Sequence, residues 1–208
     1  MATKAYNQIL PKFYTIVDSN FFNDDYEVLS DNLKSLKTLK HKPVCIFPVS
    51  KKQYIEKYEL DKELEIIYVA YDIEKSTKIK SEFYLSSLLP YSLNVANVSL
   101  YAAISMGFSE IYLLGVDMTG VLHTYDEKGE FKDSGHFFES DERLAEYESK
   151  KFNVRKNEEM LKIYGKVFQQ FRLAYEYAKK RGIKIVNLTA SGALDIFPIG
   201  KYKKIISE

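Results

Sequence analysis

The chain has 208 residues, a length that suits one domain with a substantial core. Thirty basic residues against 29 acidic ones give a formal net charge of +1, so no overall field attracts nucleic acid or an anionic membrane. The single cysteine, Cys45, lies in the apolar run Val44–Phe47, which indicates a buried structural thiol and a reducing compartment. Neither a transmembrane run nor a signal peptide is recognisable, so we expect a cytoplasmic protein. A peripheral position at the inner membrane stays open.

Apolar runs and helical periodicity predict strands that alternate with helices along the chain. The expected strands are Phe13–Asp18, Pro43–Pro48, Glu65–Ala70, Glu110–Val116 and Ile183–Leu188. The expected helices are Ser30–Leu39, Lys51–Tyr58, Asn94–Met106 and Leu144–Arg181, the last broken near Asn153 and capped by Gly182. The segment Tyr71–Tyr91 is polar and predicted to be irregular.

This alternation predicts a single α/β domain over residues 1–208, three-layered and Rossmann-like, with a mostly parallel sheet and helices on both faces. The near-continuous apolarity of Ile111–Val116 predicts that this strand is central in the sheet. The loop Thr119–Ser140 exceeds ordinary connection lengths and holds two of the three histidines, so we expect it to be a lid over a binding crevice.

Two carboxylates, Asp117 and Asp18, come at the ends of expected strands. In a parallel α/β sheet the carboxyl ends of the strands open onto the crevice where ligands bind. Asp117 could therefore orient an acceptor hydroxyl or bind a metal, and Asp18 has the same geometry. The alternative for both residues is a carboxylate that caps the following turn.

Further candidates are polar residues that precede or follow the Glu110–Val116 strand. Asn94 and Asn97 flank the start of a helix, so one is expected to cap it, and a helix amino terminus also favours an anion. Imidazole titrates near neutrality, which makes His136 a candidate general base; the alternative is a surface histidine whose aromatic neighbours anchor the loop. The chain has no Cys/His cluster and no Asp-x-Asp pair, so we expect chemistry without a metal or a cofactor.

The segment Met106–Asp117, with the letters MGFSEIYLLGVD, resembles a motif of bacterial surface-polysaccharide proteins. Named relatives in this group are the CMP-sialic acid-dependent sialyltransferases and the archaeal 6-hydroxymethylpterin diphosphokinase-like family. Thr124–Tyr125 stands at the spacing where the sialyltransferases have a Ser-Tyr pair close to the donor sugar phosphate. Other similar elements are Val17–Phe22, Gly135–Phe138 and Asn187–Leu194.

The resemblance implies a glycosyltransferase-like protein that transfers an acidic sugar, such as sialic acid, from a CMP-sugar to a glycan acceptor. It implies catalytic roles for His136 and Asp117 and substrate contacts for Asp18, Asn94, Asn97, Thr124 and Tyr125. Ser140 occupies the position of the sialyltransferases' base, so His136 is the candidate for that role. Their Gly-rich nucleotide loop is missing, and we expect the chain to start after the first βαβ unit of the family.

Two other functions stay open. One is a Mg²⁺-dependent pterin or nucleotide pyrophosphoryl transferase, in which Asp117 and Asp18 would hold the metal. The other is a non-catalytic binding or assembly subunit. Whether the chain forms a homo-oligomer also stays open.

Overall fold

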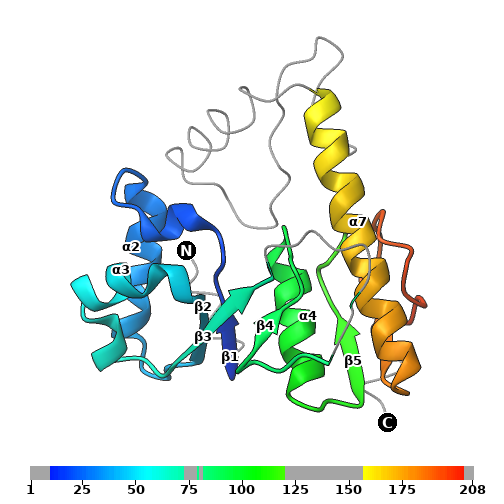
Figure 1. Cartoon of the computed structure of the whole chain (residues 1–208), viewed down its shortest axis with the longest axis horizontal. Coiled ribbons are helices and arrows are strands. Elements are labelled where there is room, and N and C mark those ends of the chain that lie inside the picture. Colours follow the sequence, from blue (N-terminus) through cyan, green and yellow to red (C-terminus); the bar gives the residue numbers. More distant parts are fainter. Residues whose placement is uncertain (1–9, 73–78, 80–81, 120–156, 204–208) are drawn as a thin grey trace. The chain divides into compact units, whose positions relative to one another are not determined.

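The computed structural model describes residues 10–72, 79, 82–119 and 157–203. The chain divides into two compact units, one formed by Met1–Lys75 and Ser81–Ala102, the other by Ser76–Lys80 and Ala103–Glu208. All strand pairs in the described residues are parallel, and helices separate most of the strands (Figure 1). The structure is therefore α/β and Rossmann-like, as the sequence predicted. A single domain over the whole chain stays a prediction.

The first unit is built on a four-stranded sheet with the strand order β1-β2-β3-β4. Its strands are β1 (Phe13–Thr15), β2 (Val44–Pro48), β3 (Ile66–Tyr71) and β4 (Leu88–Leu89). The prediction that Tyr71–Tyr91 is irregular was wrong for Leu88 and Leu89, which pair with Ala70 and Tyr71. A strand of two residues is too short to produce an alternating pattern, so its pairing is a tertiary effect.

The helices between the first three strands lie on one side of them (Figure 1). These segments are η1 (Ser19–Phe22), α2 (Glu27–Ser35), η2 (Leu36–Thr38), η3 (Val49–Lys51), α3 (Lys52–Lys57) and η4 (Leu60–Lys62). Right-handed crossovers between strands that advance in one direction place their helices on the same face. The predicted start of α2 at Ser30 was wrong: Ser30 is buried inside the helix, where its hydroxyl donates to the Glu27 carbonyl at 3.1 Å.

The core of the first unit lies between its strands and this helical layer. It joins Phe47 and Cys45 of β2 to buried side chains of the helical segments, among them Phe22, Leu33 and Ile55. The ring of Phe22 meets that of Phe47 edge-on, with centroids 5.5 Å apart. Burial of these apolar side chains is the main term that stabilises this unit.

The boundary between the units falls within helix α4 (Val95–Ser105). The helix ends at Gly107, whose φ of 83° allows the Gly107 N–H to bond the Ile104 carbonyl and the Phe108 N–H to bond the Ala103 carbonyl. This double closure is the Schellman motif, and glycine adopts its left-handed residue without a Cβ penalty. Helix α7 (Asn157–Lys180) is followed by the same arrangement at Gly182, the predicted cap.

The second unit contains a parallel pair of strands, β5 (Glu110–Leu113) and β6 (Lys184–Asn187). Strand β5 is three residues shorter than predicted, and the Leu114 side chain is 60% exposed. Among the described strands β5 pairs with β6 alone, so these pairings do not give it the predicted central position. The apolar run indicated a buried strand, but it does not predict the residue at which the hydrogen bonds to the neighbouring strand end.

Helix α7 contributes a row of buried side chains to the core of the second unit. Its buried side chains recur at helical spacing and include Met160, Val167, Phe171, Ala174 and Ala178. Phe171 and Tyr175 meet the ring of Phe197 edge-on, at centroid distances of 5.9 and 5.4 Å. Neither α7 nor another helix in the described ranges has the length and apolarity needed to cross a bilayer.

We expect the Cys45 thiol to be unreactive in the folded protein. It is fully buried, and burial raises its pKa to about 12, so the nucleophilic thiolate is scarcely populated. A thiol reagent such as DTNB at pH 8 should modify the native chain slowly. In the urea-unfolded chain one thiol per molecule should react at once. The exposed control Glu65→Cys should react immediately with one equivalent while folded, and equally rapid labelling of the native chain would contradict the prediction.

Candidate functional site

The carboxyl ends of β5 and β6 continue into two loops that are bonded to each other. The ladder extends one step, from the Leu188 N–H to the Leu113 carbonyl, and the Val116 N–H then donates to the Thr189 hydroxyl at 3.1 Å. The Ala193 and Leu194 N–H groups both donate to the Asp117 carbonyl, at 2.7 and 3.3 Å. Backbone groups that leave a sheet need new partners, and here each loop supplies them to the other.

Asn187, the last residue of β6, organises the second of these loops. Its side chain is buried and fully engaged: the amide group donates to the Leu194 carbonyl at 3.1 Å, and the amide oxygen accepts from the Thr189 N–H at 3.0 Å. Its backbone bonds Pro198 and Gly200. Sequence reasoning treated Asn187 only as part of a motif, and nothing in its spacing signals this positioning role.

Gly192 permits the close approach of the two loops. A Cβ at this position would lie 2.5 Å from the Asp117 carbonyl oxygen and 2.7 Å from the Asp117 Cα. Both are backbone atoms, which cannot rotate away as the end of a side chain can. The spacing of the loops therefore requires glycine here.

The Asp117 carboxylate lies in the loop after β5, and Thr119 fixes its position. Its Oδ1 accepts from the Thr119 N–H at 2.8 Å and from the Thr119 hydroxyl at 2.7 Å. Between them Met118 has a φ of 56°, a left-handed conformation that is uncommon for a residue with a side chain. These bonds lower the pKa of the Asp117 carboxyl, the backbone bond being the larger cause, so Asp117 is ionised at neutral pH.

Asp117 thus forms the capping turn that we considered as the alternative, but only through Oδ1. Both bonds from Thr119 end on Oδ1, and the backbone of Asp117 itself also lowers the pKa of the carboxyl group. An ionised carboxylate has about four acceptor positions, so this half-buried group can still accept from a further donor.

The candidates in the first unit also have local roles. Asp18 caps η1 by accepting from the Asn20 N–H at 3.0 Å, so it forms the predicted turn. Asn94 caps α4 by accepting from the Ala96 N–H at 2.7 Å. Asp18 follows an expected strand and Asn94 precedes an expected helix. At each of these positions the structure has a cap.

Asn97, one turn into α4, is different from Asn94. Its side chain is fully buried, and neither its amide nitrogen nor its amide oxygen has a hydrogen-bond partner among the described residues. An unpaired buried amide costs about 1–3 kcal/mol, and such groups call for an explanation by a bound water, an ion or a ligand. Among the substrate-binding candidates that the structure describes, Asn97 is therefore the one whose amide is buried without a hydrogen-bond partner.

Three predicted site residues, Thr124, Tyr125 and His136, lie outside the described residues, as does most of the expected lid. Asp117 belongs to the second unit, whereas Asp18, Asn94 and Asn97 belong to the first. Convergence of Asp117 with His136 and the Thr124–Tyr125 pair stays a prediction.

Comparison with protein-family models, with curated proteins and with solved structures gives no match. The family suggested by the motifs therefore stays a prediction.

Replacing Gly192 with alanine should destabilise the second unit by about 1–3 kcal/mol, the usual cost of overpacking, because the new Cβ collides with the Asp117 backbone. Urea unfolding followed by circular dichroism measures the difference. The matched control is Gly165→Ala within α7, where a Cβ meets nothing within 4 Å and should stabilise by about 0.5–1 kcal/mol. Equal effects of the two substitutions would show that the close approach is not required.

Asp117→Ala should lower the free energy of unfolding at pH 7 by about 1–2 kcal/mol, because two bonds from Thr119 to a charged acceptor are lost. The folded pKa of Asp117 lies below its ordinary value of 3.8, so its contribution is complete above that pH and disappears as pH falls through the folded pKa. The difference between native and variant, measured by urea unfolding, should therefore shrink at low pH.

Asp195→Ala is the control for that experiment, since it removes an exposed carboxylate from the other loop, the one that follows β6. It should change stability little at either pH. An Asp117→Ala effect that is the same at pH 7 and below pH 3 would contradict the role of the ionised carboxylate.

Proposed function

We propose that the chain is a glycosyltransferase-like protein of bacterial surface-polysaccharide biosynthesis that transfers an acidic sugar from a CMP-sugar to a glycan acceptor. The observation that carries the proposal is the state of Asp117. It is an ionised, half-buried carboxylate beyond the carboxyl ends of two parallel strands, with one oxygen fixed by Thr119 and with acceptor capacity left for a ligand hydroxyl. Parallel α/β proteins bind their ligands at this edge of the sheet.

Asp117 would act by accepting a hydrogen bond from the acceptor hydroxyl. The Thr119 bonds fix one carboxylate oxygen, so Oδ2 has a defined direction without a ligand. A hydrogen-bond acceptor fixed in this way orients the attacking hydroxyl group before the reaction, and this orientation lowers the barrier. Because Asp117 is already ionised, it needs no proton loss on binding.

The resemblance assigns substrate contacts to Asn94 and Asn97, which belong to the first unit. Asn94 caps α4, and the positive end of a helix favours an anionic group. The Asn97 amide has no hydrogen-bond partner among the described residues, so it could bond a polar ligand group. The resemblance assigns the remaining steps to His136 as base and to Thr124 and Tyr125 at the leaving phosphate.

A thermal-shift panel tests the proposal on the whole chain. CMP and CMP-sialic acid should raise the melting temperature by several degrees at saturating concentration without Mg²⁺, because binding to the folded state alone stabilises it. Asp117→Asn should leave the shift by CMP nearly intact, since its proposed partner is the acceptor, and should lower transfer to a glycan acceptor. Asp195→Asn is the control for both the thermal shift and the transfer assay.

Other outcomes separate the alternatives. The melting temperature could instead rise only with Mg²⁺, and with purine nucleotides or a pterin rather than with CMP. That outcome would contradict the proposal and favour pyrophosphoryl transfer. No shift with any nucleotide would favour a non-catalytic binding or assembly subunit.

A further inference from the structure

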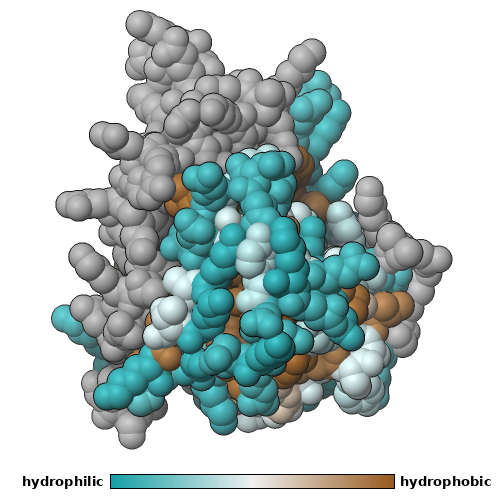
Figure 2. All heavy atoms as spheres, turned by 90° about the vertical axis from the view of Figure 1, so that its left-hand side faces the viewer, coloured by the Kyte–Doolittle hydropathy of each residue, from teal (hydrophilic) through white to brown (hydrophobic). Residues whose placement is uncertain are grey.

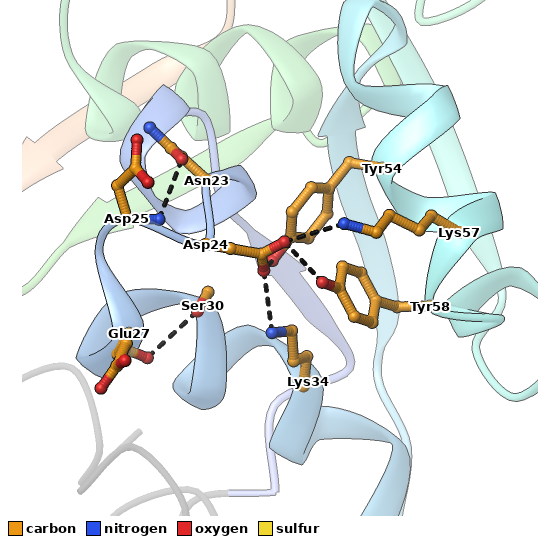
Figure 3. A network of polar contacts seen from close by, with 9 residues as sticks. All are labelled: Asn23, Asp24, Asp25, Glu27, Ser30, Lys34, Tyr54, Lys57 and Tyr58. Atoms are coloured by element: carbon orange, nitrogen blue, oxygen red, sulfur yellow. Dashed lines mark hydrogen bonds and ion pairs between the residues drawn. The ribbon is translucent and has the colours of Figure 1, made fainter.

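A cluster of polar side chains surrounds Asp24 in the first unit, far in sequence from the strand-end loops (Figure 3). The Asp24 carboxylate accepts from Lys34 Nζ and Lys57 Nζ at 3.0 Å each, and from the hydroxyl groups of Tyr54 and Tyr58 at 2.9 and 2.5 Å. The residues of this cluster are spread over three separate segments, so no sequence motif indicates it.

The donors and the acceptor come from different kinds of structure. Lys34 belongs to α2, Tyr54 and Lys57 to α3, and Tyr58 directly follows α3, whereas Asp24 lies in the short connection between η1 and α2. Contacts among the donors themselves help to fix them. The Tyr54 and Tyr58 rings are 4.8 Å apart, and Lys34 Nζ lies 4.1 Å from the centroid of the Tyr58 ring. The donor set is thus a cradle built on helices, with a loop residue inside it.

The charges in the cradle are unequal. Two ammonium groups face one carboxylate, and two hydroxyl groups add further donors, so a single negative charge leaves one positive charge uncompensated. Lys57 has no other ion pair in the described residues. A phosphate dianion would match both lysines and could accept all four hydrogen bonds.

The cradle is accessible to solvent. The side chains of Asp24 and Lys57 are 42% and 61% exposed. The face of the molecule on the α2 and α3 side is mainly hydrophilic (Figure 2). Both ion pairs are partly exposed, so dissolved anions can reach the two ammonium groups.

We propose that Lys34, Tyr54, Lys57 and Tyr58 form an anion-binding site, that Asp24 is its tethered occupant, and that a phosphate dianion, free or as a monoester, exchanges with Asp24 there. A tethered group competes at an effective concentration on the order of millimolar, so phosphate compounds in that range can displace it. Exchange releases the connection at Asn23–Tyr26, which follows the η1 segment capped by Asp18. This inference does not depend on the proposed transferase function.

The test compares two variants that each remove one negative charge from the same connection, Asp24→Ala and Asp25→Ala. The Asp25 carboxylate accepts no hydrogen bond from the cradle, and its backbone N–H bonds Asn23 instead. Isothermal titration at pH 8 and constant ionic strength measures the binding of inorganic phosphate and of glycerol 3-phosphate. Removal of the tethered competitor should tighten binding by about tenfold or more in Asp24→Ala relative to Asp25→Ala. The tighter of the two ligands identifies free phosphate or a monoester as the class.

Equal affinities in the two variants would overturn the proposal. So would unchanged affinity when Lys57→Gln is added to Asp24→Ala, because a cradle lysine is then not required. If Asp24→Ala does not fold, hydrogen exchange on the native chain decides the matter. Exchange at residues 23–26 should be faster in phosphate than in sodium chloride of equal ionic strength, and equal rates would overturn the proposal.

Discussion

Parallel pairing is the constraint on which both units depend. Because paired strands run in one direction, each chain crossing must return along the outside of the sheet, and every carboxyl end emerges at the same edge of its sheet. The loops at that edge leave the ladder with unpaired backbone groups. In the second unit the loops after β5 and β6 solve this by bonding each other, through the Asp117 carbonyl and the Thr189 hydroxyl. The requirement for Gly192 and the engaged side chain of Asn187 follow from that tie.

Two aspartates show how the surroundings decide what a carboxylate can do. Asp117 accepts two bonds from Thr119 on one oxygen, and these bonds favour its ionised form. Asp24 receives four bonds from two helices and the residue after α3, and these donors hold its pKa far below the usual range. It therefore resembles a bound anion more than a residue waiting for one. The same chemical group is a site component in one place and an occupant in the other.

Asn97 presents the opposite situation. Asn94 and Asn97 are three positions apart at the start of α4, yet one is a satisfied cap and the other a buried amide without a partner. The Asn94 bond offsets the desolvation of its side chain, whereas no described residue bonds the buried Asn97 amide. This difference directs attention to the first turn of α4 as a place where a polar ligand group would be stabilised.

The sequence by itself determined the elements whose signal is local. Apolar runs located β2, β3 and β6, a run of small residues located α4, and helical period located α7. The Asp18 turn and the Gly182 cap also followed from neighbours along the chain, whereas the choice between Asn94 and Asn97 as the cap of α4 stayed open. Only the tertiary structure decided where β5 ends, that Leu88 and Leu89 form a strand, and that Asp24 meets Lys34 and Lys57. It also decided the role of Asn187 and the need for glycine at position 192. The reason is physical: caps and periodicity depend on residues within a few positions, whereas pairing, close backbone approach and multi-helix hydrogen bonding depend on segments that only folding brings together.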